Sequence, residues 1–74
     1  MQVSWSKAAA FDAADSVGWK QAESEAKTMF ADRSVLAMAR QSSPDLLWLE
    51  LPCGLEVSFQ VVAGEDQVHI WRAA

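Results

Sequence analysis

Cysteine, histidine and basic residues are scarce in this 74-residue sequence, and each shortage excludes a class of protein. The only cysteine, Cys53, has no internal disulfide partner, which favours a cytoplasmic over a secreted protein. One cysteine and one histidine do not make a zinc site, so we expect no metal and no cofactor. Six Lys and Arg against ten Asp and Glu give a net charge of −4, which disfavours nucleic acid and anionic membranes as partners.

Long apolar runs are also missing, so we expect no membrane span, and the N-terminus does not have the pattern of a signal peptide. What the chain does have is 51% hydrophobic residues, enough to fold. Its length predicts a single domain over residues 1–74. A core this small is marginally stable alone, so a protein partner or a homodimer is expected.

The stretch from Leu46 to Trp71 has the clearest pattern, an alternation of period two that predicts three antiparallel strands. Pro52-Cys53-Gly54 predicts the first turn. With Cys53 at its apex, Leu49 faces Val57 and Leu47 faces Phe59. A shift of one residue would bury charged or polar side chains instead of these apolar ones.

Gly64-Glu65 suits a two-residue second turn with glycine first. That turn places Val61 opposite Val68 and Phe59 opposite Ile70. Both turns, read separately, therefore bring apolar residues together on the same side of the sheet.

The same register predicts the other face of the sheet. Trp48, Ser58 and Trp71 are expected in one row, and Leu46, Gln60 and His69 in the next. Glu50 and Glu56 are expected opposite each other at one end, a mildly unfavourable pair unless it is solvated or binds a cation.

The first half of the chain is predicted to be helical. Ser6 is a plausible N-cap for a helix over Lys7–Asp15, and an apolar stripe continues from Trp19 to Phe30. Whether Gly18 breaks the helix stays open. Asp32 or Ser34 is expected to cap a further short helix, and residues 42–45 to end the helical region.

These elements predict an α+β fold, in which two or three N-terminal helices pack on one face of a three- or four-stranded antiparallel sheet ending in a meander. Residues 2–5 are the candidate fourth strand, at a sheet edge. One helical layer cannot cover both sheet faces. The face with Trp48 and Trp71 is therefore exposed, covered by residues 1–5, or buried against another chain.

His69, Ser58 and Glu56 share that face, and their residue types allow a catalytic triad. A triad also needs an oxyanion hole, which a flat strand surface rarely offers. We therefore favour a non-enzymatic interaction module that binds a protein through the Trp48 and Trp71 face, because exposed aromatic patches are enriched at interfaces. The alternative on this face is a small-ligand site, with an aromatic or cationic compound between the indoles and the two glutamates.

Both ends of the sequence resemble the RelE/ParE toxin superfamily. Residues 1–12, MQVSWSKAAAFD, look like its first strand and helix, and residues 55–62 with 67–72 resemble its final hairpin. The resemblance implies a toxin, or a degenerate relative of one, with a helical antitoxin segment as partner. In the ribonuclease branch basic residues hold the messenger RNA; the matching positions here are the acidic Glu50 and Glu56. The ParE-like branch acts on a topoisomerase by protein contact, which implies a protein-binding domain.

Overall fold

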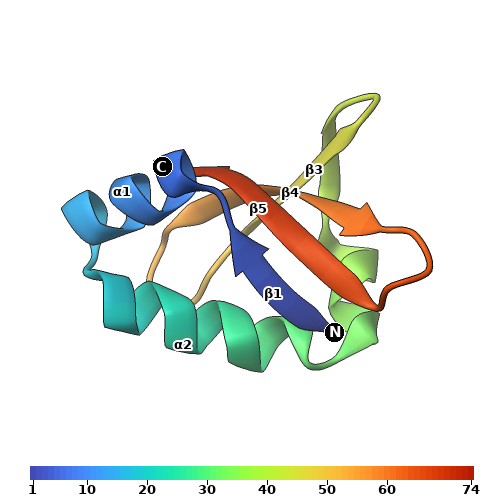
Figure 1. Cartoon of the computed structure of the whole chain (residues 1–74), viewed down its shortest axis with the longest axis horizontal. Coiled ribbons are helices and arrows are strands. Elements are labelled where there is room, and N and C mark those ends of the chain that lie inside the picture. Colours follow the sequence, from blue (N-terminus) through green and yellow to red (C-terminus); the bar gives the residue numbers. More distant parts are fainter.

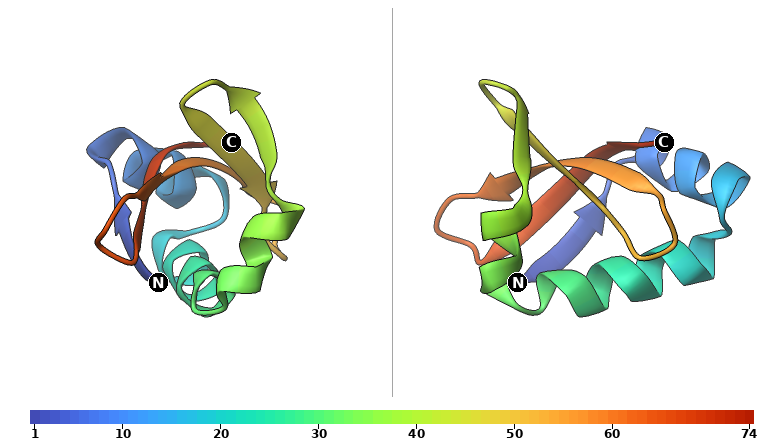
Figure 2. Two further views of the ribbon diagram at one scale, coloured as in Figure 1. Left: turned by 90° about the vertical axis from the view of Figure 1, so that its right-hand side faces the viewer. Right: turned by 180° about the vertical axis from the view of Figure 1, so that it is seen from behind.

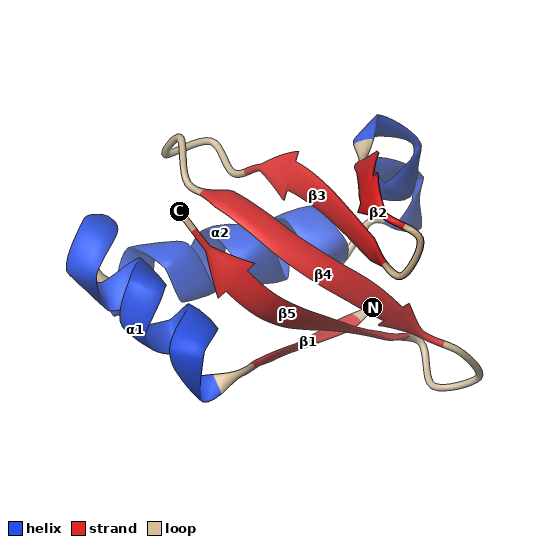
Figure 3. Cartoon of the chain, turned by 90° about the horizontal axis from the view of Figure 1, so that it is seen from above, coloured by secondary structure: helices blue, strands red, loops and turns tan.

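The structure, a computed structural model, describes residues 1–74 (Figure 1). Its elements follow in the order β1 (Gln2–Trp5), α1 (Lys7–Ser16), α2 (Trp19–Phe30), the 3-10 helix η1 (Arg33–Met38), β2 (Arg40–Ser43), β3 (Leu46–Glu50), β4 (Glu56–Val62) and β5 (Gln67–Ala73). The strands form one five-stranded sheet in the order β1-β5-β4-β3-β2. Figure 3 shows α2 lying across one side of this sheet, while the other side carries no helix.

The α+β class is as predicted, but the sheet has five strands and is mixed rather than antiparallel. Residues 2–5 do form an edge strand, yet they run parallel to β5, with Val3 opposite Val68 and Trp5 opposite Ile70. The long path through α1, α2 and η1 separates β1 from the hairpins and lets it join the sheet in this direction.

Strand β2 was not predicted. Its sequence, RQSS, has no apolar residue and no strand-forming alternation. It is a strand because it pairs with β3, with Arg40 opposite Trp48 and Gln41 opposite Leu47. The predicted end of the helical region at residues 42–45 is therefore wrong. The helical region ends at Met38, and Pro44-Asp45 forms the turn between β2 and β3.

The first hairpin has the predicted register. Leu49 lies opposite Val57 and Leu47 opposite Phe59. At its closed end the amide of Leu51 donates to the carbonyl of Leu55 at 2.8 Å. The alternation of apolar residues and the chemistry of the turn were enough to predict this register, because one face of the hairpin is buried and a shifted register would expose its apolar side chains.

The second hairpin starts as predicted, with Val61 opposite Val68 and Phe59 opposite Ile70. Its turn is wider than two residues: Val62 and Gln67 are the last pair, and residues 63–66 form the turn.

Beyond Ile70 the register of the second hairpin shifts. Ser58 pairs with Arg72, so Trp71 is an extra residue in β5. This β-bulge makes the predicted row of Trp48, Ser58 and Trp71 wrong. The bulge also returns Ala73, two residues after Trp71, to the core opposite Val57.

The helix boundaries follow local chemistry. The Ser6 hydroxyl accepts a hydrogen bond from the amide of Ala9 at 3.0 Å, which confirms the predicted N-cap. Gly18 does break the helix, because its φ of 96° lies outside the helical region. Asp32 caps η1 by accepting from the amide of Ser34 at 2.9 Å.

The core lies between the helices and one face of the sheet, as predicted. Phe30 of α2 packs edge-to-face on Phe59 of β4, with ring centroids 4.8 Å apart. Trp5 of β1 makes a similar contact with Trp19 of α2 at 5.1 Å. Fourteen residues are buried: Ala9, Ala13, Ala22, Ala26, Phe30, Val35, Leu49, Leu51, Leu55, Val57, Phe59, Val68, Ile70 and Ala73.

The two turned views in Figure 2 show α2 below the sheet and the β2–β3 hairpin extending away from it. Strand β1 extends the sheet sideways and does not fold over its uncovered side. No helix is both long and apolar enough to cross a membrane.

Candidate functional site

We call the side of the sheet without helices the open face (Figure 3). One row of paired residues crosses four of its strands: Arg40, Trp48, Ser58 and Arg72. The guanidinium of Arg40 lies 5.9 Å from the centroid of the Trp48 ring, within the range of a cation–π contact. Trp48 is half-buried.

A shallow hollow of about 390 Å³ opens beside this row. Its lining residues are Ser42, Trp48, Glu56, Ser58, Arg72, Ala73 and Ala74. The hollow thus combines one indole with one carboxylate and one guanidinium.

A second row on the open face contains Gln60, His69 and Ser4. Ser4 Oγ lies 2.6 Å from His69 Nδ1 and accepts a hydrogen bond from Gln67 Nε2 at 2.9 Å. Gln60 faces His69 as predicted. Leu46, the third predicted member, pairs with Ser43 and shares another shallow hollow with Gln60.

Trp71 belongs with this second row rather than with Trp48. Its indole packs edge-to-face on His69, with centroids 4.4 Å apart, and its Nε1 donates to Gln60 Oε1 at 2.9 Å. The side chain is still 44% exposed. The two tryptophans therefore occupy separate positions on the open face, and no ligand site forms with the indoles facing each other across Ser58.

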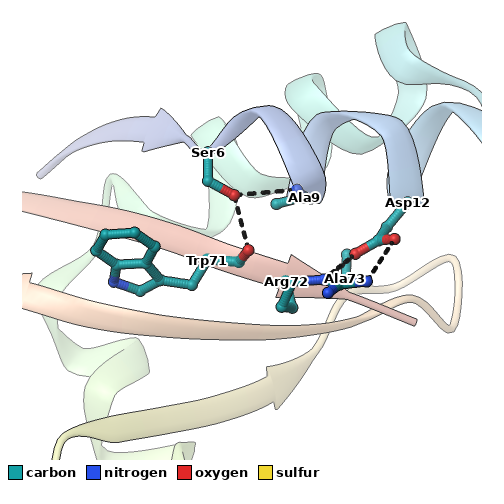
Figure 4. Close-up of polar contacts among 6 residues, drawn as sticks. All are labelled: Ser6, Ala9, Asp12, Trp71, Arg72 and Ala73. Carbon is teal, nitrogen blue, oxygen red and sulfur yellow. Dashed lines mark hydrogen bonds and ion pairs between the residues drawn. The ribbon is translucent and has the colours of Figure 1, made fainter.

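The backbone at Trp71 is held by the start of α1 (Figure 4). The Ser6 hydroxyl donates to the carbonyl of Trp71 at 2.7 Å, and the Ser6 amide donates to the carbonyl of Ile70 at 2.8 Å. The Ser6–Ile70 bond continues the parallel pairing of β1 with β5, whereas the Ser6 hydroxyl satisfies the carbonyl of the extra residue, Trp71.

Asp12 of α1 makes a second connection to β5 (Figure 4). One carboxylate oxygen accepts from Arg72 Nε at 2.8 Å and from the amide of Ala73 at 3.0 Å, and the other accepts from the Arg72 guanidinium at 3.2 Å. The hydrogen bond from Arg72, followed by that from Ala73, lowers the pKa of Asp12. The same pairing raises the pKa of Arg72, whose positive charge is thereby matched within the chain.

Glu50 and Glu56 lie opposite each other, as predicted, and both are exposed. The two ion pairs in the chain involve other residues, so these carboxylates have no cationic partner. This end of the open face is therefore acidic.

The triad considered from sequence is not assembled. Ser58 pairs with Arg72, whereas His69 contacts Ser4. Ser4 was missed because its strand had been placed only at an unspecified sheet edge. Parallel pairing with β5, combined with the inward side chains of Val3 and Trp5, would have predicted Ser4 beside His69. No group of three His, Cys, Asp or Glu residues is arranged so that it could hold a metal ion.

No protein-family model matches the sequence, and no curated protein matches it. A solved structure does match the fold: a chain of the intact E. coli RelBE toxin–antitoxin complex, with a TM-score of 0.65 at 14% identity. The match covers 99% of this chain and 93% of that chain. At this identity the similarity establishes a RelE-like fold, and it extends over the middle of the chain as well as the two ends.

Proposed function

We propose that this chain is the RelE-fold member of a toxin–antitoxin type pair, and that it acts by binding a protein rather than by cutting RNA. The observation that carries the proposal is the fold match over nearly the whole chain to a component of a complex of that kind. The match also supports one part of the interaction-module hypothesis, namely that the chain binds a protein partner.

The open face is the surface we assign to the partner. Trp71 is 44% exposed while its ring is already oriented by His69 and Gln60. Trp48 is likewise positioned by Arg40. Aromatic side chains that are fixed before binding lose little rotamer freedom on association, which is one reason they dominate binding energy at interfaces.

The charges argue against RNA as the main ligand. Glu50 and Glu56 would face the phosphates, and Arg72 is already paired with Asp12. Arg40 is the remaining cation of the row that crosses the open face. A chain of net charge −4 with this arrangement repels a polyanion.

The test is expression in bacteria with and without the product of the adjacent gene, followed by co-purification. We expect growth arrest that the neighbour relieves, a stable complex, and intact cellular RNA. The double variant Trp48→Ala and Trp71→Ala should bind at least about tenfold more weakly, as expected for two interface aromatics. Met38→Ala is the matched control, since Met38 is 62% exposed but lies on η1.

RNA cleavage by the purified chain would overturn the non-nucleolytic part of the proposal. Harmless expression together with no complex would overturn the toxin–antitoxin assignment itself. Unchanged affinity in the double tryptophan variant would show that the partner binds somewhere other than the open face.

The small-ligand alternative ranks second. It was based on one compound lying between the two indoles and the pair Glu50 and Glu56, and the bulge at Trp71 separates the two indoles. The hollow beside Trp48 is the remaining candidate, and a titration of tryptophan fluorescence in the Trp71→Phe variant would report on it.

A further inference from the structure

The outer side of α1 carries an apolar surface that nothing in the chain covers. Phe11 is 68% exposed, more than any other large hydrophobic residue that is exposed here. It borders a hollow of about 300 Å³ lined by Lys7, Ala10, Phe11, Ala14 and Trp19. Figures 1 and 3 show α1 at the end of the molecule, beside the sheet and away from the middle of the open face.

Two opposite charges flank Phe11 symmetrically. Lys7 lies four residues before it and Asp15 four residues after it, and both are exposed. In an α-helix a step of four residues turns by about 400°, so the two side chains lie about 40° to either side of Phe11, one turn up and one turn down. Neither residue takes part in an ion pair within the chain.

We infer that this surface is a self-association site whose occupant is α1 of a second copy of the chain. A two-fold axis that passes beside Phe11, at right angles to α1, sets the two helices antiparallel. Lys7 of each copy then lies level with Asp15 of the other. When the helices cross along the row of residues spaced by four, each such pair is brought together, which forms two identical ion pairs. Each Phe11 can enter the hollow beside Trp19 of the other copy.

The charge pattern selects this arrangement over others. Parallel helices would place Lys7 against Lys7 and Asp15 against Asp15, which is repulsive. A two-fold axis pairs each surface with the same surface of the other copy, so the surface must be complementary to itself after rotation. The surface around Phe11 meets this condition, because Lys7 and Asp15 carry opposite charges. An unrelated partner would not require the symmetric placement of charges around Phe11.

The expected dimer is weak and reversible. Helix α1 has ten residues and is therefore about 15 Å long, so a contact of two such helices falls at or below the low end of interface sizes. It leaves the Trp48 and Trp71 positions on the open face free, and it does not depend on the proposed function.

The first test measures mass by sedimentation equilibrium over a concentration series from low micromolar to millimolar. We expect a monomer–dimer equilibrium in the natural chain and a shift of at least tenfold towards monomer in Phe11→Ser. Met38→Ser, a similarly exposed substitution on η1, should leave the equilibrium unchanged. A monomer at every concentration, or a dimer unaffected by Phe11→Ser, overturns the inference.

The second test uses charge reversal. Lys7→Asp alone and Asp15→Lys alone should each weaken the dimer, because each puts like charges together twice. An equimolar mixture of these two variants should form heterodimers, and the double variant should dimerise like the natural chain. Both substitutions favour the helix dipole, so circular dichroism should show an intact fold. Failure of the mixture and of the double variant to restore dimers overturns the antiparallel arrangement.

Discussion

The hydroxyl of Ser6 donates to the carbonyl of Trp71 across 65 residues of sequence, at 2.7 Å, and accepts from the amide of Ala9 at 3.0 Å. One side chain thus starts α1 and fixes the bulge in β5. The bulge in turn places the Trp71 ring against His69. A local capping residue therefore contributes to the shape of the open face.

The Ser6→Ala variant should lose about 1–2 kcal/mol of unfolding free energy, because it removes the cap and leaves a bulge carbonyl with one partner fewer. Urea denaturation at neutral pH measures this loss. Ser24→Ala is the control, since Ser24 is exposed on α2 and should change stability by less than about 0.5 kcal/mol. Equal stability of the two variants would show that the Ser6 bonds contribute nothing.

The Asp12→Asn variant should be destabilised at neutral pH and not in acid. The pKa of Asp12 is lowered from its ordinary value of 3.8, so the carboxylate stabilises the folded state above pH 3.8. That contribution is lost as the pH falls below 3.8 and through the lower pKa of the folded state. The stability difference between the natural chain and the variant should shrink over this range.

Urea denaturation at a series of pH values measures the Asp12 effect, with Glu23→Gln as the control because Glu23 is exposed and has no ion-pair partner in the chain. A difference that persisted unchanged at low pH would contradict the pairing with Arg72.

The two phenylalanines of the helices should behave oppositely. Phe30 is fully buried against Phe59, so Phe30→Ala should cost about 3–5 kcal/mol. Phe11 is 68% exposed, so Phe11→Ala in dilute solution should cost less than about 0.5 kcal/mol. Should Phe30→Ala not fold, Phe30→Leu should give a smaller loss of about 1.5 kcal/mol. Similar losses at both positions would refute the assigned core.

Gly18 has a φ of 96° and a ψ of 137°, a conformation that side chains with a Cβ rarely adopt. Nothing lies within 4 Å of the position its Cβ would take, so the cost of Gly18→Ala comes from the backbone alone. We expect a loss of about 1–3 kcal/mol in thermal or urea unfolding. Gly18→Asn should cost a similar amount. A neutral Gly18→Ala would mean that α1 and α2 can be joined differently.

Sequence reasoning worked best where local chemistry and burial agree. The register of the first hairpin, the Ser6 cap and the helical cover over Phe59 are confirmed. In each case a slip of one residue would expose apolar side chains or leave backbone groups unpaired, so few alternatives exist. Glu50 and Glu56 were placed opposite each other for the same reason.

The candidate site was predicted less completely than the core. Trp48, Ser58, Gln60 and His69 were correctly paired between neighbouring strands, but Trp71 was assigned to the wrong row. The bulge is in contact with the start of α1, because the Ser6 hydroxyl donates to the carbonyl of Trp71. Such a partner, more than sixty residues away in sequence, leaves no local signal.

The amino-acid order by itself determined the start of α1, the apolar stripe of α2, the meander and the separation of an apolar from a polar sheet face, because these depend on neighbours in the chain and on turns of a few residues. Only the tertiary structure decided the parallel pairing of β1, the strand β2 and the position of Trp71. Strand partners at a sheet edge are chosen by whichever backbone hydrogen-bonding groups the rest of the fold leaves free, and that choice is made in three dimensions.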